Sequence, residues 1–259
     1  NLLNDYLPEV EDIIYFKDHL IKATYKNDVI SVKGRGEIKF QKKFDKIEYS
    51  IDNKNKNLNL ISNINLSEVT TNNLKILKNF FPKINKKINF KDHKVQIKYI
   101  DNTLFFKGSG KIQLEKEFNQ IDYSVIKNID KFNFDTKIYL NETLLKVDYL
   151  NFITDKKFKT QLTVEGEYDD GSGLNLKKVI INSKNNKILL KNFLINKENK
   201  IVKIDELSLN YIDIQNKNNK WSLLRKQKNN YELNGSIFNA NSLLTNLLET
   251  KNESQSMIF

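Results

Sequence analysis

The chain of 259 residues contains no cysteine, only two histidines and only two prolines. Without cysteine it can form neither a disulfide bond nor a thiolate metal site. This absence fits a reducing compartment, and equally a periplasm in which the fold needs no covalent cross-links. No uninterrupted apolar run approaches the ~18 residues of a membrane-spanning helix, and no signal peptide is visible. We interpret the chain as a segment of a longer polypeptide, because it begins with Asn1 instead of Met and ends at Phe259 without an evident stop signal.

The residues that are present make the chain polar and basic. Hydrophobic residues account for 39% and charged residues for 29%, and the formal net charge is +11. A charge of this sign is compatible with nucleic acid or an anionic membrane as partner. Lysine, asparagine and isoleucine are frequent along the whole chain, however, and the lysines form no single block. Compositional bias and solubility therefore explain the charge better than a dedicated polyanion site.

One stretch of the sequence occurs twice. KGRGEIKFQKKFDKIEYS at residues 33–50 returns as KGSGKIQLEKEFNQIDYS at residues 107–124, an offset of 74 residues, with nine of the eighteen positions identical. The same offset, with no gap, also aligns both histidines and both prolines, at Phe16–His19, Phe90–His93, Pro8 and Pro82. Repetition at a fixed period indicates supersecondary units stacked so that each covers the open apolar surface of its neighbour.

Apolar and polar residues alternate within each repeat. The apolar positions include Ile30, Val32, Ile38 and Phe40, and one repeat later Leu104, Phe106, Ile112 and Leu114. Strict alternation predicts strands with one apolar and one polar face. Connectors as short as Asn27-Asp28 and Asp101-Asn102 join adjacent antiparallel strands, so each unit is predicted to be a meander. Gly34 and Gly36 fall on the apolar face, where a missing side chain allows a bend or close packing.

Three segments favour short amphipathic helices, near residues 1–8, 71–82 and 241–251. The predicted fold class is mainly β: a long, curved and twisted antiparallel sheet built from 74-residue repeats with short amphipathic helices. The predicted units are residues 1–74 and 75–148, a divergent continuation of the sheet over 149–240, and a terminal helix and tail over 241–259 that starts a next unit.

The apolar face of such a sheet has to be covered. Leaving about 1,000 Å² of apolar surface in water would cost on the order of 25 kcal/mol. That exceeds the whole stability of a typical domain, about 5–15 kcal/mol. Three short helices are too little to cover a sheet that runs the length of the chain. The sheet is therefore expected to curl on itself, to meet a second sheet, or to hold a hydrophobic ligand.

No motif in the sequence indicates catalysis. His19 and His93 are equivalent positions one unit apart, so they are predicted to be structural, in a turn before a strand, and not a metal or acid–base pair. KGRG and KGSG lack the phosphate-loop pattern, and DDGSG at Asp169–Gly173 lacks the spaced carboxylates of a calcium loop and is predicted to be a turn. We therefore expect no catalytic residues, no metal and no cofactor, and a protein that is not an enzyme.

The combination of helices, strand pairs and glycines resembles the AsmA-like superfamily of bacterial envelope proteins, including its TamB and YhdP groups. The stretches that carry the resemblance are NDYLP and NFFP at the helix ends, the strand pairs through VISVKGRGEIKF and LFFKGSGKIQL, and YELNGSIFNANSLLTNLLE near the end. The pattern spans nearly the whole chain. Two features differ from the pattern of the superfamily. The apolar positions of the strands include many aromatic residues, and the sequence after Leu144 departs from the repeat.

The resemblance implies a segment of a periplasmic protein, anchored in the bacterial inner membrane by a helix outside this segment. It implies a hydrophobic β-groove that carries phospholipid between the inner and outer membranes. The expected partners are phospholipid acyl chains, the inner membrane and envelope proteins, and not nucleic acid. The residues predicted to line the groove are Val32, Ile38, Phe40, Phe106, Ile112, Leu114, Phe132 and Phe134.

Two other functions remain open at this point. The first is a structural or adhesive β-scaffold whose apolar face is filled by its own side chains. The second is a protein that binds single-stranded nucleic acid, because Phe44, Tyr49, Phe118 and Tyr123 could stack bases beside lysines. The repetition of these aromatic residues at equivalent positions favours packing or groove lining over base stacking.

Overall fold

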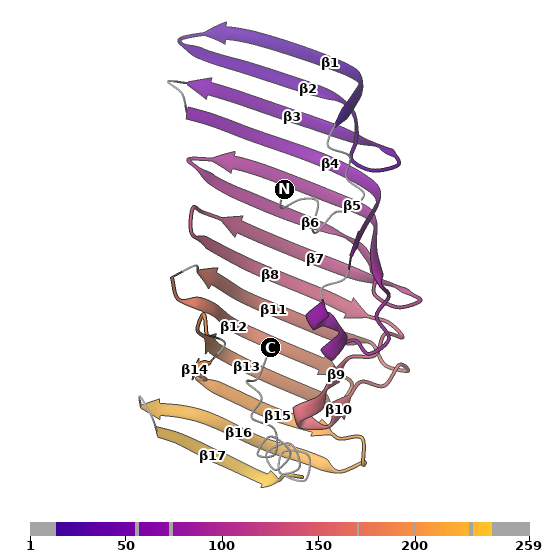
Figure 1. The fold of residues 1–259 in the computed structure, drawn as a ribbon, viewed down its shortest axis with the longest axis vertical. Helices are drawn as coiled ribbons and strands as arrows, with labels where there is room; N and C mark the ends of the chain where they lie inside the picture. Colours follow the sequence, from indigo (N-terminus) through magenta and orange to yellow (C-terminus); the bar gives the residue numbers. More distant parts are fainter. Residues whose placement is uncertain are drawn as a thin grey trace. The chain divides into compact units, whose positions relative to one another are not determined.

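A computed structural model, drawn in Figure 1, describes residues 14–54, 57–72, 75–169, 171–198, 200–227 and 230–239. The contacts divide the chain into two compact units. Of the described residues, the first unit contains 14–72, 85–114 and 118–134, and the second contains 75–84, 115–117 and those from Asp135 onward.

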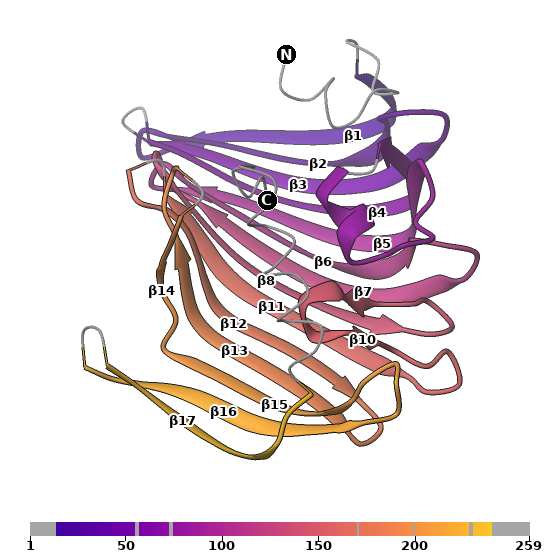
Figure 2. The same cartoon turned by 60° about the horizontal axis from the view of Figure 1, so that its bottom comes forward.

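The first unit is a set of consecutive antiparallel strands that lie side by side in one layer (Figure 2). Each strand pairs with the next one in sequence, as the short connectors predict. The strands are β1 (Tyr15–Lys26), β2 (Val29–Lys39), β3 (Phe44–Lys54), β4 (Asn57–Asn72), β5 (Lys87–Ile100), β6 (Thr103–Gln113), β7 (Phe118–Lys127) and the first residues of β8 (Lys131–Leu140).

Two-residue turns join β1 to β2 and β5 to β6. Asn27 and Asp28 have φ of 51° and 59°, and Asp101 and Asn102 have φ of 49° and 58°. Asparagine and aspartate tolerate this left-handed conformation, and the tight turn that it forms matches the twist of paired strands. The Tyr25 hydroxyl donates to Asp28 at 2.9 Å and the Tyr99 hydroxyl to Asn102 at 2.9 Å, so both turns are fastened in the same way. The turns predicted at these positions are confirmed.

The predicted helix over residues 71–82 is wrong at both of its ends. Strand β4 continues to Asn72, where Thr70 and Thr71 pair with Asn89 and Ile88 of β5. Only a short 3₁₀ helix, η1 (Lys75–Asn79), precedes Pro82. The two threonines favour a strand because their β-branched side chains pack well on a pleated surface. The predicted helices near residues 1–8 and 241–251 lie outside the described residues.

The second unit begins with η1 and contains the last residues of β8 and the strands that follow it. Its elements after β8 are β9 (Lys146–Val147), η2 (Asp148–Leu150), β10 (Phe152–Ile153), β11 (Thr160–Asp169), β12 (Gly173–Ser183), β13 (Asn186–Ile195), β14 (Ile201–Lys203), β15 (Glu206–Ile212), β16 (Asn218–Gln227) and β17 (Asn230–Ile237). Strands β9 and β10 form a separate two-stranded sheet. The carboxylate of Asp169 accepts hydrogen bonds from the amides of Gly171 and Ser172. These bonds stabilise the predicted turn between β11 and β12.

The β9–β10 hairpin packs on residues from several parts of the second unit. Phe152 is fully buried, and its ring meets that of Tyr211 edge to face at 5.4 Å. The Tyr211 hydroxyl donates to the carbonyl of Leu150 at 2.7 Å, and the amide of Lys146 donates to the carbonyl of Phe80 at 2.8 Å. Burial raises the pKa of Tyr211 to about 12, with a further contribution from Asp213. This core of the second unit is filled by its own side chains.

The prediction of a mainly β, antiparallel fold is confirmed, and among the described residues there is almost no helix. All described strands except β9 and β10 belong to one 15-stranded sheet, which is not closed. Its order follows the sequence from β1 to β8 and continues through β11, β12, β13, β15, β16 and β17, with β14 paired to β13.

We expect Phe152→Ala to lower the free energy of unfolding by about 3–5 kcal/mol, because it opens a cavity at a fully buried position. Denaturant unfolding monitored by circular dichroism measures the change. The matched control is Tyr149→Ala in the adjacent 3₁₀ helix, where the side chain is 51% exposed. Equal losses in the two variants would contradict the packing described for the hairpin.

Candidate functional site

The strand registers of the first unit place apolar side chains from successive strands on one face. Ile47 of β3 lies opposite Ile64 of β4, which lies opposite Val95 of β5. Together with Ile38 of β2 these residues form a buried cluster. The partly buried residues that pack against it are Phe40, Tyr49, Leu66, Ile97 and Phe106. We call this surface of β1 to β7 the apolar face.

The predicted lining residues differ in how far they are accessible. Ile38, Ile112 and Leu114 are only 4%, 6% and 2% exposed, so neighbouring side chains cover them. Val32, Phe40 and Phe106, by contrast, are half-buried, and so is Phe134 at the end of the unit. Phe132 is 36% exposed and lies under the Lys127 ammonium, which is 5.0 Å from its ring centroid. The accessible part of the predicted lining is therefore mainly aromatic.

The apolar face carries two polar clusters of the same composition. In the first, His19 and Tyr49 lie over Gly36 and Gly34, where a Cβ atom would overlap their rings. In the second, His93 and Tyr123 lie in the same way over Gly110 and Gly108. We call these the first and second His–Tyr pairs. The glycines of KGRG and KGSG are thus needed because aromatic rings approach the backbone there.

Each histidine occupies a β-bulge. His19 and its neighbour Asp18 stand opposite the single residue Gly36, and His93 and Asp92 stand opposite Gly110. Asp18 and Asp92 have φ of 53° and 55°, a conformation that aspartate tolerates better than most residues. The prediction that both histidines lie in turns is therefore wrong, because the FKDH motif forms a bulge inside a strand. The structural role predicted for the two histidines, however, fits the observed contacts.

The imidazoles link the bulge to the tyrosines. Nε2 of His19 donates to the carbonyl of Glu37 at 2.9 Å, and Nε2 of His93 donates to the carbonyl of Lys111 at 2.9 Å. Because a carbonyl only accepts, Nε2 carries the proton and Nδ1 is left as an acceptor. The Tyr123 hydroxyl donates to Nδ1 of His93 at 3.1 Å, and the corresponding distance from Tyr49 to His19 is 3.5 Å.

Burial shifts the ionisation of the second His–Tyr pair. Burial lowers the pKa of His93, which is 2% exposed, although its hydrogen bond to the Lys111 carbonyl and the charge of Asp92 act in the opposite direction. Burial also raises the pKa of Tyr123 to about 12. Both groups are therefore neutral near pH 7, and the pair acts as a hydrogen-bonded clamp without net charge.

Another left-handed residue inside a strand was not predicted from the sequence. Asn192 in β13 has φ of 49° within the motif Lys191–Asn192–Phe193, which resembles Lys-Asp-His of the first unit, but its pairing with β12 keeps one register and forms no bulge there. Phenylalanine replaces the histidine, and the Asn192 side chain donates to Asp205 at 2.9 Å. The sequence contains one sign of this residue, the short motif Lys-Asn-Phe after an apolar pair. The motif lies 100 residues after Lys91-Asp92-His93, so the 74-residue repeat does not reveal it.

Phe44 and Phe118 do not belong to the apolar face. Phe44 pairs with Lys39 and Phe118 with Gln113, and these positions point to the other side of the sheet from their neighbours Asp45 and Asn119. Each phenylalanine lies under a lysine, with Lys17 Nζ 5.7 Å from the Phe44 ring centroid and Lys91 Nζ 5.8 Å from that of Phe118. These contacts are cation–π interactions on the polar face.

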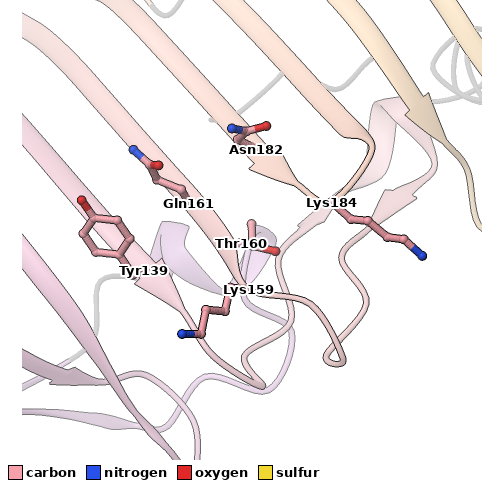
Figure 3. Close-up of a pocket in the computed structure, with 6 residues that line it drawn as sticks. All are labelled: Tyr139, Lys159, Thr160, Gln161, Asn182 and Lys184. Atoms are coloured by element: carbon pink, nitrogen blue, oxygen red, sulfur yellow. The ribbon is translucent and has the colours of Figure 1, made fainter.

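The second unit contains a small hollow at the ends of β8, β11 and β12 (Figure 3). It encloses about 270 Å³ and is lined by Tyr139, Lys159, Thr160, Gln161, Asn182 and Lys184, of which Lys184 extends away from the other five. Thr160 is already hydrogen-bonded to Ser183 at 2.8 Å, and Lys184 lies 4.1 Å from the ring centroid of Phe158. A hollow without aliphatic side chains and smaller than most ligand sites does not suit an acyl chain.

Two kinds of site are absent from the described residues. No three side chains of His, Cys, Asp or Glu gather there as possible metal ligands. No helix in the described part of the chain has the length and hydrophobicity to cross a membrane.

We expect Gly110→Ala to lower the free energy of unfolding by about 1–3 kcal/mol, because the added methyl group overlaps the buried imidazole of His93. Chemical denaturation measures the change. Lys107→Ala, an exposed position on the same strand, is the control and should alter stability by less than about 0.5 kcal/mol. Equal stability of Gly110→Ala and the native chain would contradict the stacking of His93 on the backbone.

The lowered pKa of His93 predicts a pH dependence of stability. In the unfolded chain this group binds a proton near its ordinary pKa of about 6.5, whereas the folded state resists protonation. Its contribution is therefore complete above pH of about 6.5 and is lost progressively as the pH falls below that value. Melting temperatures between about pH 5.5 and 7.5 should fall on acidification, and less steeply in His93→Gln. An unchanged slope in His93→Gln would refute the assignment.

Comparisons with protein-family models, with curated proteins and with solved structures find no match to this chain.

Proposed function

We propose that this chain is a lipid-binding segment of an AsmA-like envelope protein, and that phospholipid acyl chains lie on its apolar face. The protein would act without catalysis, as a passive conduit between the inner and outer membranes of a bacterium. It would work in the periplasm, held to the inner membrane by an anchor outside this segment.

The observation that carries the proposal is the single layer of the first unit. Its described strands all belong to one sheet, so no second sheet of that unit faces the apolar side chains. At β1 the same face is strongly exposed, with Phe16 61%, Ile21 57% and Tyr25 71% accessible. Exposed apolar surface of this kind is typical of a ligand or interaction site. An acyl chain would remove it from water at a gain of roughly 25 cal/mol per Å².

The doubled contacts support an array of similar units. Besides the His–Tyr pairs, Gln41 exchanges two hydrogen bonds with the backbone of Thr70, while Glu115, 74 residues later, accepts from the amide of Leu144. A conduit requires many weak and similar contacts, because a single tight pocket would hold its ligand too long. In this proposal the sheet curves into a trough, and lipid headgroups stay in water at its rim, where lysines favour anionic phosphates.

A structural scaffold is the second candidate function, and the second unit favours it. There Leu145 and Phe152 are only 2% and 0% exposed, so the protein's own atoms cover them. In the first unit, too, Ile38, Ile112 and Leu114 are covered by neighbouring side chains. The two functions differ in whether lipid contacts the accessible residues of the apolar face.

Photo-crosslinking at adjacent residues of β6 distinguishes them. Phe106 belongs to the apolar face, whereas Phe105 points to the opposite face and is 36% exposed. A photoreactive amino acid in place of Phe106, in the full-length protein in cells, should yield lipid adducts, and one in place of Phe105 should yield few. Adducts at neither position, together with no lipid in native mass spectrometry, would favour the scaffold.

A further inference from the structure

The two His–Tyr pairs are joined by a continuous path across the strands of the first unit. Tyr49 lies opposite Ser62, Ser62 opposite Ile97, and Ile97 opposite Phe106. The Phe106 ring then stacks on that of Tyr123, with centroids 5.6 Å apart and planes inclined by 21°. We call the five residues Tyr49, Ser62, Ile97, Phe106 and Tyr123 the cross-strand path.

We infer that the cross-strand path is the floor on which a long acyl chain lies, and that Tyr49 and Tyr123 select lipids long enough to contact both rings. This inference rests on the proposed function. It names the substrate class as long-chain lipids and assigns the two tyrosines as the residues that determine specificity.

The position of the two tyrosine rings supports this inference. Each ring fills the volume in which Gly34 or Gly108 would carry a Cβ atom, so it lies against the backbone of the neighbouring strand. A ring in this position adds little height to the apolar face. An upright ring would instead divide the face between β2 and β4, or between β6 and β8, and would obstruct a chain lying across the strands.

Hydrogen bonds hold the tyrosine rings in this position. The hydroxyl of Tyr123 is bound to Nδ1 of His93, and the imidazole is itself fixed by the Lys111 carbonyl and by its place over Gly110. Tyr49 and His19 repeat this arrangement. The hydroxyls are thereby satisfied by the protein, so the ring faces present an apolar surface to a ligand.

The length of the cross-strand path fits a long acyl chain. Tyr49 is in β3 and Tyr123 in β7, four strand spacings apart, which corresponds to about 19 Å at ~4.8 Å per spacing. A long acyl chain lying across the strands reaches both rings, whereas a short chain reaches only one of them. Ser62 is only 4% exposed, so the middle of the path offers a ligand little polar surface.

The test compares two lipids that share a headgroup, dipalmitoyl and dioctanoyl phosphatidylglycerol, in binding to the full-length protein. Gly108→Ala, which lifts the Tyr123 ring, should weaken binding of the long-chain lipid about tenfold and of the short-chain lipid less than about twofold. Gly34→Ala should do the same at Tyr49. The short-chain lipid tolerates either change because the other ring remains available.

Ser109→Ala, beside Gly108 but pointing to the opposite face, is the matched control and should change neither affinity. Should Gly108→Ala fail to fold, Tyr123→Leu removes the ring face without adding a clash and should give the same selective loss. Equal weakening of both lipids, or of neither, would overturn the inference while leaving the proposed function in place. Failure of the native protein to bind either lipid would overturn both.

Discussion

The hydrogen bond from a histidine to a backbone carbonyl inside a β-bulge is the contact on which the first unit depends most. At His93 it holds the imidazole over Gly110, and the imidazole in turn receives the hydroxyl of Tyr123. The ring of Tyr123 then supports Phe106. Removal of the imidazole would therefore release a carbonyl, a hydroxyl and two aromatic rings together, because each of them is positioned by the previous one.

Much of the first unit could be predicted from the sequence. The alternation around Ile30–Phe40, the Asn27-Asp28 and Asp101-Asn102 turns and the antiparallel order all follow from local rules that this chain obeys. The sequence also placed Gly34 and Gly36 on the apolar face. It did not reveal that rings occupy their missing Cβ positions, because that depends on residues in two other strands, His19 and Tyr49.

The remaining differences have physical causes of the same kind. A helix was predicted where Thr70 and Thr71 extend β4, since the apolar residues that follow them fit a helical spacing as well as a strand. The β9–β10 hairpin was missed because strands of two residues leave no periodic signal. Its stability comes from Phe152, Tyr211 and Phe80, which are far apart in the sequence. The accessibility of the predicted lining residues likewise depends on their neighbours across the sheet.

The bulge at Asp92 also reverses which side of the sheet the odd-numbered and even-numbered residues of β5 face. Beyond it Val95 and Ile97 belong to the apolar face, whereas before it Phe90 does, opposite Ile112. An alignment that ignores this extra residue would assign half of the strand to the wrong side of the sheet. Insertion of a second extra residue beside Asp92 would turn Phe90 and Ile88 toward the polar side, so the length of this strand is as constrained as its composition.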